Sequence, residues 1–408
     1  MPPPTPFTLG INYWPRCKAM YWWSNFDAGE VREEFAVIHA VGLRMVRLFL
    51  LWEDWMPAPD TVNPAALGHL ETVANLAAGQ GLQLNVTFFT GHMSGPNWAP
   101  GWMLERDKPL PPRVRQLVSG GQPVDCGYIN PYVHPVALAA EELLLRTVVG
   151  RLKDHPAIGL WNLGNEPDLF ARPPSAPDGK AWAHRLATLI REIDPVHPIT
   201  CGLHVPSLTE DNGLRVHDIF SEVDVPVMHG YPMYAAWSTG PLDPDFVPFL
   251  SGLTAALAGK PALMEEFGGC TTPPGRPSTV WAWQGYGQPL LQFMASEEDF
   301  AEYLDHVLTR LVAVGALGAL LWCYADYSTD LYDRPPCDQM KHERFFGLVR
   351  PDGSLKPHAE VIRRFAATQP VVQAAEHPVV LDLSPEDYYR APLKHARRLY
   401  AAYRKRSE

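Results

Sequence analysis

The chain has 408 residues, a net charge of −11 and a hydrophobic fraction of 46%, which fit either one large core or two ordinary domains. Lys and Arg form no run before residues 395–408, and no apolar stretch approaches the roughly 18 residues of a membrane span, so neither nucleic acid nor a membrane is an expected partner. The N-terminus lacks a signal-peptide pattern and the cysteines form no CxxC pair, which predicts a cytoplasmic protein without a zinc site of that type.

Short apolar runs alternate with amphipathic segments along the chain, as expected for strands buried on both faces and helices that cover them. The predicted strands are residues 7–13, 44–51, 82–89, 157–164, 198–204, 224–230, 261–267 and 317–325. Helices are predicted at about 27–42, 63–81, 136–153, 178–193, 208–222, 243–258, 297–314 and 355–367. This alternation predicts an α/β fold of the (β/α)₈ barrel type. An open doubly wound sheet would carry a Gly-rich phosphate loop after its first strand, and "GINYWPRCK" is not one.

Three long connections follow the third, seventh and eighth predicted strands, at residues 90–135, 268–296 and 325–354. In a barrel they lie at the C-terminal ends of the strands, where barrel enzymes build their sites. The catalytic barrel is predicted to occupy residues 1–369. Residues 370–408 are predicted to form a C-terminal helical appendage rather than a second domain.

Two glutamates stand at strand ends on this face. Glu166 follows the fourth strand in "GLWNLGNEPDL", and Glu266 follows the seventh in "PALMEEFGG". These strands lie across the barrel mouth from each other, so the two side chains can converge. Paired carboxyl groups suit glycoside hydrolysis, in which one protonates the leaving oxygen and the other attacks the anomeric carbon or activates a water. A water-facing strand end would explain one such glutamate but explains two less well.

Further polar and aromatic residues fall at neighbouring strand ends. Arg47 lies inside an apolar strand and needs an anionic partner there. His229 and Tyr231 end the sixth strand, and Trp322 lies in the eighth, where an indole could stack on a sugar ring. Each residue alone also fits a structural role, such as an ion pair or a core contact. Because all of them fall on the same face of the predicted barrel, they favour a sugar-binding site there.

The order of these motifs resembles a known family. The motifs are "VRL" (46–48), "NEP" (165–167), "HGYP" (229–232), "EFG" (266–268) and the Trp of "LLW" (320–322). Over about residues 7–367 the chain resembles the retaining (β/α)₈ glycoside hydrolases of clan A, and most of all family 5. Within that family, "GKPALMEEFGG" and "HGYPMYAAW" look most like the β-mannanase branch, from which "NLGNEP" departs.

The resemblance implies a role for each matched residue and no metal or cofactor. It makes Glu166 the general acid/base and Glu266, rather than Glu265, the nucleophile. Strand alternation agrees that only one of the two adjacent glutamates faces the pore. The other implied roles concern substrate binding: Asn165 at the sugar 2-hydroxyl, Arg47 and Tyr231 beside the nucleophile, Trp322 as the floor, and His92 and His229 at further hydroxyls.

The predicted function is that of a retaining β-glycosidase acting on β-mannosidic oligosaccharides, with a β-galactosidase or β-glucosidase as the alternative. A sugar-binding barrel without catalysis would be expected to lack one of the glutamates. A metal-dependent barrel hydrolase would need a ligand cluster such as HxH at a strand end, which the sequence lacks. No oligomeric state is predicted.

The long connections carry aromatic residues that could close one end of the cleft. We therefore expect a pocket lined by some of Trp52, Trp98, Trp102, Trp281 and Trp283, and with it exo-type or short-oligosaccharide specificity. These indoles could also simply pack the connections against the barrel.

Overall fold

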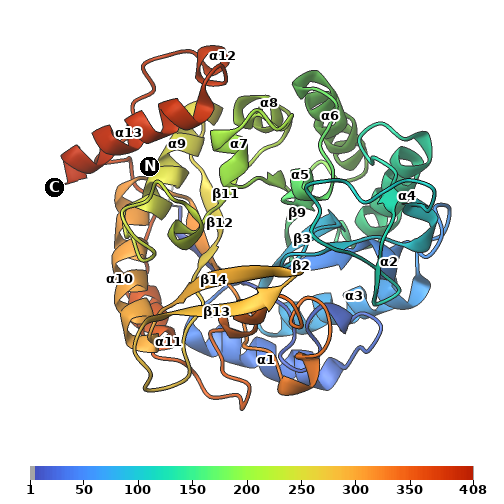
Figure 1. Cartoon of the computed structure of the whole chain (residues 1–408), viewed down its shortest axis with the longest axis horizontal. Coiled ribbons are helices and arrows are strands. Elements are labelled where there is room, and N and C mark those ends of the chain that lie inside the picture. Colours follow the sequence, from blue (N-terminus) through green and yellow to red (C-terminus); the bar gives the residue numbers. More distant parts are fainter. Residues whose placement is uncertain (1–4, 408) are drawn as a thin grey trace.

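The structure is a computed structural model that describes residues 5–407, and its centre is a barrel of eight parallel strands (Figure 1). The strands are β1 (Thr8–Asn12), β2 (Met45–Leu51), β3 (Gln83–Thr90), β9 (Ile158–Asn165), β10 (Ile199–Gly202), β11 (Val227–His229), β12 (Leu263–Gly268) and β15 (Gly318–Trp322). They follow the order β10-β9-β3-β2-β1-β15-β12-β11, and a parallel bridge between His204 and His229 joins the two ends of this sheet. The predicted (β/α)₈ fold is confirmed, and every predicted strand overlaps one barrel strand.

The barrel helices lie outside the strands and cover them. They are α1 (Ala28–Val41), α3 (Pro64–Gly79), α4 (Pro135–Leu152), α6 (Ala176–Ile193), α8 (Val216–Glu222), α9 (Phe246–Ala258), α10 (Glu297–Ala313) and α11 (His358–Ala367). Local chemistry sets their ends. The Asp27 carboxylate accepts hydrogen bonds from two backbone N–H groups at the start of α1, and Gly42 ends that helix with a φ of 100°.

The predicted helix at 208–222 is wrong in its first half. The structure has a short helix α7 (Val205–Thr209), then a turn, and then α8. Asn212 accepts a hydrogen bond from the Leu214 backbone N–H, and Gly213 adopts a φ of 88°, which only glycine adopts without strain. The Asn-Gly pair therefore interrupts the helix.

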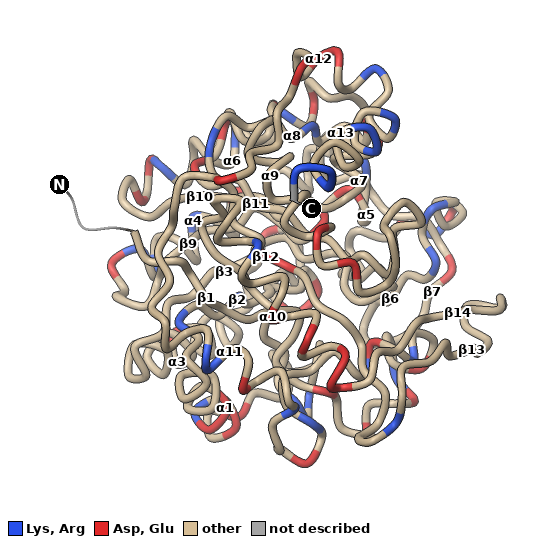
Figure 2. Tube along the Cα trace, turned by 90° about the vertical axis from the view of Figure 1, so that its left-hand side faces the viewer, with Lys and Arg blue, Asp and Glu red and all other residues tan. Residues whose placement is uncertain are grey.

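The long connections carry small sheets and short helices. Residues 90–135 contain β4 (Asn97–Trp98), η2 (Gly101–Met103), β5 (Leu104–Glu105), β6 (Leu117–Ser119), β7 (Gln122–Val124) and β8 (Gly127–Tyr128). Residues 268–296 contain the hairpin β13 (Thr279–Gly285) and β14 (Gln288–Met294), and residues 325–354 contain η4 (Thr329–Leu331) and η5 (Lys341–Phe345). Shorter pieces are η1 (Ala19–Tyr21), α2 (Trp52–Trp55), α5 (Pro167–Phe170) and η3 (Pro232–Tyr234). Figure 2 shows β6, β7, β13 and β14 on one side of the molecule.

The C-terminal segment packs against the barrel helices through α12 (Pro385–Tyr388) and α13 (Pro392–Ser407). The Tyr388 and Tyr389 hydroxyls donate to the carbonyls of Leu208 and Ser207, which lie in α7, at 2.6 and 2.7 Å. The Tyr400 ring packs on Phe249 of α9, with 4.9 Å between ring centroids.

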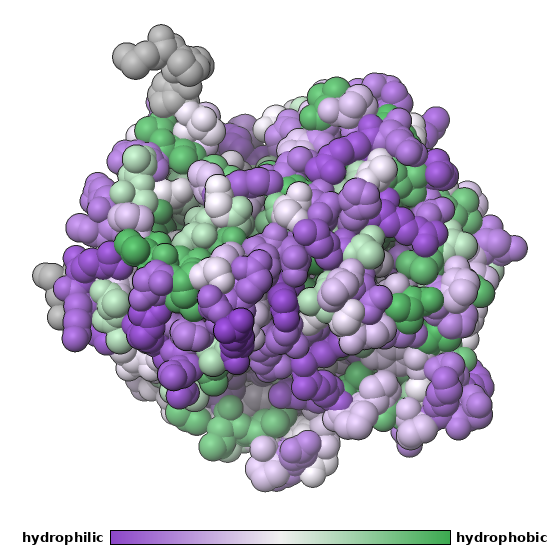
Figure 3. All heavy atoms as spheres, turned by 90° about the horizontal axis from the view of Figure 1, so that it is seen from above, coloured by the Kyte–Doolittle hydropathy of each residue, from purple (hydrophilic) through white to green (hydrophobic). Residues whose placement is uncertain are grey.

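The surface seen from above is mainly polar. Figure 3 shows hydrophobic residues scattered among hydrophilic ones on this face. Within residues 5–407, every helix is too short or too polar to cross a membrane.

Candidate active site

A cavity of about 800 Å³ opens at the C-terminal ends of the barrel strands. Buried or nearly buried polar side chains form its base, among them Asn165, Glu166, His229 and Glu266. The indole of Trp322, at the end of β15, lines the same space. The cavity lies where a barrel enzyme places its site.

The two predicted catalytic carboxylates face each other across this base. Glu166 follows the last residue of β9 and has a φ of 44°, a left-handed conformation that is uncommon for a residue with a side chain. Pro167 starts α5 directly after it. Glu266 lies in β12, and one oxygen of each carboxylate lies within 4.8 Å of the other. This backbone conformation costs free energy, and such strain is found where it orients a functional side chain.

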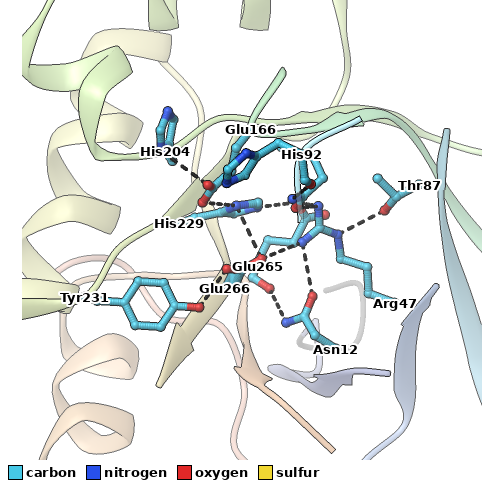
Figure 4. A network of polar contacts seen from close by, with 12 residues as sticks. Asn12, Arg47, Thr87, His92, Glu166, His204, His229, Tyr231, Glu265 and Glu266 are labelled. Carbon is cyan, nitrogen blue, oxygen red and sulfur yellow. Dashed lines mark hydrogen bonds and ion pairs between the residues drawn. The ribbon is translucent and has the colours of Figure 1, made fainter. Parts of the chain in front are cut away.

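Hydrogen bonds hold Glu266 from two sides (Figure 4). The Arg47 guanidinium lies 3.0 Å from one carboxylate oxygen, and the Tyr231 hydroxyl donates to the other at 2.6 Å. Arg47 is fully buried and also donates to Asn12 and Thr87. The anionic partner expected for this buried arginine is therefore Glu266, aided by Glu265 at 3.6 Å.

Asn165 and His92 join the same network. The Asn165 side-chain oxygen accepts from Arg47 at 2.9 Å, and its amide donates to the His92 carbonyl at 3.1 Å. The His92 ring contacts Asn97 at 2.7 Å and lines the cavity. The structure thus brings all eight predicted site residues to one place, and their individual roles stay predictions.

Glu265 also lies inside the barrel, although strand alternation predicts that it faces away from Glu266. Its carboxylate is fully buried below the cavity and accepts from the side chains of Asn85 at 2.6 Å and Asn162 at 2.9 Å. The pairing of β12 with β15 shifts register between Met264 and Phe267, which breaks the alternation at this point. The alternation argument is therefore wrong, yet Glu266 and not Glu265 lines the cavity.

Two histidines lie against Glu166. His229 Nδ1 is 3.1 Å from Glu166 and 3.5 Å from Glu266, so this ring lies between the two carboxylates. His204 Nδ1 is 3.5 Å from the second oxygen of Glu166, and its Nε2 is 2.8 Å from Asp168. Figure 4 shows Glu166 between these two rings.

These contacts set the charges in the site. Burial opposes a charge on His204, but Asp168 and Glu166 outweigh it and raise the pKa of His204 to about 9. Burial likewise opposes the charge of Glu166, yet the cationic His204 and the His229 hydrogen bond prevail and lower the pKa of Glu166. Burial raises the pKa of Glu266, although the His229 charge counters it. These shifts favour a proton on His204 over a proton on Glu166.

Some of these side chains have the chemistry of metal ligands. Glu166, His229 and Glu266 each bring one polar atom within 4.8 Å of the others. However, Arg47 already contacts Glu266 and two histidines contact Glu166, so side chains supply the positive charge. This donor set fits proton transfer, and we assign no ion or cofactor to it.

The sequence analysis did not identify three polar residues of the site. His204 is the last residue of a predicted strand, a position that could have identified it. Asp168 follows two residues after Glu166, with no spacing that distinguishes it from a surface aspartate. Glu343 lies in the connection after β15 and lines the cavity, where burial raises its pKa to about 8. Its position depends on how that connection folds.

The predicted aromatic lining is wrong. Trp52, Trp98, Trp102, Trp281 and Trp283 do not line the cavity within the described part of the chain. They pack the connections instead: Trp52 on Phe89, Trp281 on Phe345, and Trp102 with its indole N–H on the Met56 carbonyl. The aromatic rings that do line the cavity are Tyr231, Tyr234, Trp237, Trp322 and Phe346.

A (β/α)₈ barrel with two close carboxylates at the C-terminal ends of its strands has the architecture of a glycoside hydrolase. The chain matches the family described as "Glycosyl hydrolases family 2, TIM barrel domain" over residues 123–368, more than half of its length. The chain belongs to this family.

Similar individual proteins include mannosidases. A probable mannan endo-1,4-beta-mannosidase F of Aspergillus flavus is 28% identical over 141 residues, which are 30% of this chain and only 29% of that relative. The structure of the exo-beta-1,4-mannosidase Op5Man5 from Opitutaceae bacterium strain TAV5 superposes with a TM-score of 0.72 and 24% identity, over 89% of this chain and 60% of that one.

A glycoside hydrolase of subfamily GH5_18 from Streptomyces cattleya, solved in complex with GlcNAc, gives a TM-score of 0.78 at 19% identity, over 98% of this chain and 90% of that one. The structural likeness establishes a shared fold. The relatives and the similar solved structures confirm the predicted resemblance to clan A and family 5, while the family model that matches is that of family 2.

Proposed function

We propose that the chain hydrolyses β-mannosidic oligosaccharides with retention of configuration, with Glu266 as nucleophile and Glu166 as general acid/base. The observation that carries the proposal is the carboxylate pair, with oxygens within 4.8 Å of each other. Retaining enzymes hold their carboxyl groups about 5–5.5 Å apart, and inverting enzymes leave about 6.5–9.5 Å for a water. The short separation supports direct attack by one carboxylate.

The contacts of each carboxylate bear on these roles: Glu266 accepts two hydrogen bonds that favour its charged form, and Glu166, whose pKa is lowered, has His204 as its proton source. Arg47 and Tyr231 direct Glu266 and stabilise its negative charge, as a nucleophile requires. In the first step Glu266 attacks the anomeric carbon, while a proton on Glu166 passes to the leaving oxygen as the glycosidic bond breaks. In the second step Glu166 takes a proton from a water that attacks the same carbon and releases Glu266. His204 lies beside Glu166 and can return and remove that proton.

The sugar is proposed from the relatives, because the mannosidases named above share the fold or part of the sequence. The end-trimming mode is proposed from the cavity, whose walls include Trp237, Met340 and Leu393 from three separate connections or helices. A cytoplasmic location stays a prediction from the sequence.

A panel of nitrophenyl β-mannoside, β-galactoside and β-glucoside, with short manno- and gluco-oligosaccharides, tests the proposal. We expect the mannosides to be cleaved fastest, and proton NMR to show the β-anomer as the first product. Faster cleavage of galactosides or glucosides would select the alternative sugar, and an α-anomer would overturn retention. No cleavage of any glycoside, with sugars still bound, would indicate a binding barrel.

Variants of the two glutamates complete the test. Glu166→Gln and Glu266→Gln are each expected to lower turnover by about four orders of magnitude or more with the fold intact. Glu302→Gln, on the exposed surface of α10, is the matched control and should retain activity. Normal turnover of Glu266→Gln would remove Glu266 as the nucleophile.

A further inference from the structure

The outer part of the cavity is lined by positive charge. Arg113, Arg115 and Arg397 line the same cavity as the catalytic pair, and all three residues are exposed. The carboxylates that line it are Glu166, Glu266 and Glu343, and the side chains of all three lie mostly buried at its base. In a chain with a net charge of −11, the exposed charged residues of the lining are thus positive, and we call the part of the cavity at these arginines its entrance.

These arginines are incompletely paired. Within residues 5–407, Arg115 and Arg397 have no carboxylate within ion-pair distance, and Arg115 donates to the Met340 sulfur at 3.9 Å. Arg113 lies 3.5 Å from Glu210, and this carboxylate also serves Arg172 at 2.6 Å. The donors at the entrance are therefore available to a ligand.

The C-terminal helix contributes to this entrance. Leu393 and Arg397 are four residues apart in α13, so they lie on one face of the helix, and both line the cavity. Figure 2 shows α13 beside α7. The hydrogen bonds from Tyr388 and Tyr389 to the carbonyls of α7 fix this arrangement.

The α7 side of the cavity is the side of the general acid. Helix α7 starts one residue after His204, which contacts Glu166, and Val205, Pro206 and Thr209 of this helix line the cavity. Because the general acid protonates the leaving oxygen, the leaving group lies on its side. Trp322 and Phe346 line the cavity from β15 and the connection that follows it, and β15 pairs with the strand that carries Glu266.

We infer that α13 and residues 113–115 of the connection after β3 form a leaving-group subsite that binds an anionic group, such as a carboxylate or a phosphate, on the sugar that is released. Guanidinium groups bind both anions through paired hydrogen bonds. The inference rests on the proposed β-mannosidase activity and names the class of substrate that the site prefers. An exposed positive entrance would also raise the association rate of an anionic substrate.

The test compares three disaccharides that differ only in the released sugar: β-mannosyl-1,4-glucose, β-mannosyl-1,4-glucuronate and β-mannosyl-1,4-glucose 6-phosphate. At low ionic strength we expect kcat/KM to be about tenfold higher for an acidic disaccharide than for the neutral one. The two acidic substrates separate carboxylate from phosphate recognition. Equal kcat/KM for all three would overturn the inference.

Variants assign the effect to the helix. Arg397→Ala and Arg113→Ala should each reduce the preference for the acidic substrate by about threefold, and Arg397→Lys should retain part of it. Lys394→Ala is the control, because this residue is exposed on the same helix and does not line the cavity. A preference that survives in Arg397→Ala and Arg113→Ala would remove these residues from the subsite.

Nitrophenyl β-mannoside separates the two proposals, since its leaving group is small and uncharged. Cleavage of this compound at the same rate in all variants, without an effect of charge on the disaccharides, would leave the enzymatic function standing and reject the subsite. If no β-mannoside is cleaved, the proposed function fails. The subsite is then decided by calorimetric binding of the disaccharides, and equal or absent binding of the acidic and neutral forms would reject it.

Discussion

The Asp168–His204 pair controls the charge beside Glu166. The His204 pKa is raised to about 9, so the ring is a cation below that pH and loses its proton above it. The proton that reaches the leaving group then depends on His204, and activity should fall as pH rises through this pKa. Asp168→Asn removes the charge that holds the proton on His204, so the alkaline limb of kcat/KM should move to lower pH by about one unit or more.

The pH profile of nitrophenyl β-mannoside hydrolysis measures this shift. Asp330→Asn, at an exposed position outside the cavity, is the matched control and should leave the limb in place. A lowered rate with an unchanged alkaline limb in Asp168→Asn would show that Asp168 has only a structural role.

Tyr231 is the second residue whose effect can be measured alone. Its hydroxyl donates to Glu266 at 2.6 Å, and a hydrogen bond to a charged group contributes about 1.5–3 kcal/mol. Tyr231→Phe should therefore lower kcat by about 10- to 100-fold while the unfolding transition stays in place. Tyr303→Phe, at a buried ring of α10 that does not line the cavity, should leave kcat unchanged. Equal rates in the two variants would contradict the role of Tyr231.

The sequence predicted individual site residues where they lie at the end of an apolar run that forms a strand. Glu166, Glu266 and His229 follow apolar runs, and the barrel brings such positions together. Glu343 could not be placed in this way, because it lies in a connection without a repeating pattern. The buried position of Glu265 also escaped prediction, since it depends on a register shift between two strands.

At the scale of elements, the anchoring of the C-terminal segment is open to test. The Tyr389 hydroxyl donates to the Ser207 carbonyl and accepts from the Val216 backbone N–H at 2.8 Å, so it joins the segment to α7 and α8. Tyr389→Phe leaves both buried groups without this partner and should lower the free energy of unfolding by about 1–3 kcal/mol. Urea denaturation measures the change. Arg390→Ala, an exposed neighbour, should cost less than about 0.5 kcal/mol, and a similar loss in both variants would contradict the anchor.

The barrel elements themselves could be predicted because the apolar runs have the length and composition of buried strands. The connections could not, as their small sheets depend on contacts between distant segments, such as β4 with β6. The same limit explains why the positions of the five tryptophans were predicted wrongly. The tryptophans indicated a lining, whereas they pack the connections and α2 against one another and against the barrel.

At the scale of the whole molecule, the walls of the cavity predict how the enzyme meets a polymer. Segments after β3, β10, β11 and β15, together with α13, contribute to its lining, so the catalytic pair lies at the base of a walled space. An enzyme that cleaves a polymer internally needs an open groove, because the chain must pass through the site. A walled cavity admits only a chain end or a short oligosaccharide.

We therefore expect soluble β-mannan to release small sugars slowly, with little loss of viscosity for each reducing end formed. Mannobiose and mannotriose should be cleaved with a much higher kcat/KM. Viscometry combined with a reducing-end assay measures both quantities. An endo-acting mannanase run in parallel should show the opposite ratio, and rapid viscosity loss with mixed oligomers from this chain would mean that the walls leave a groove open.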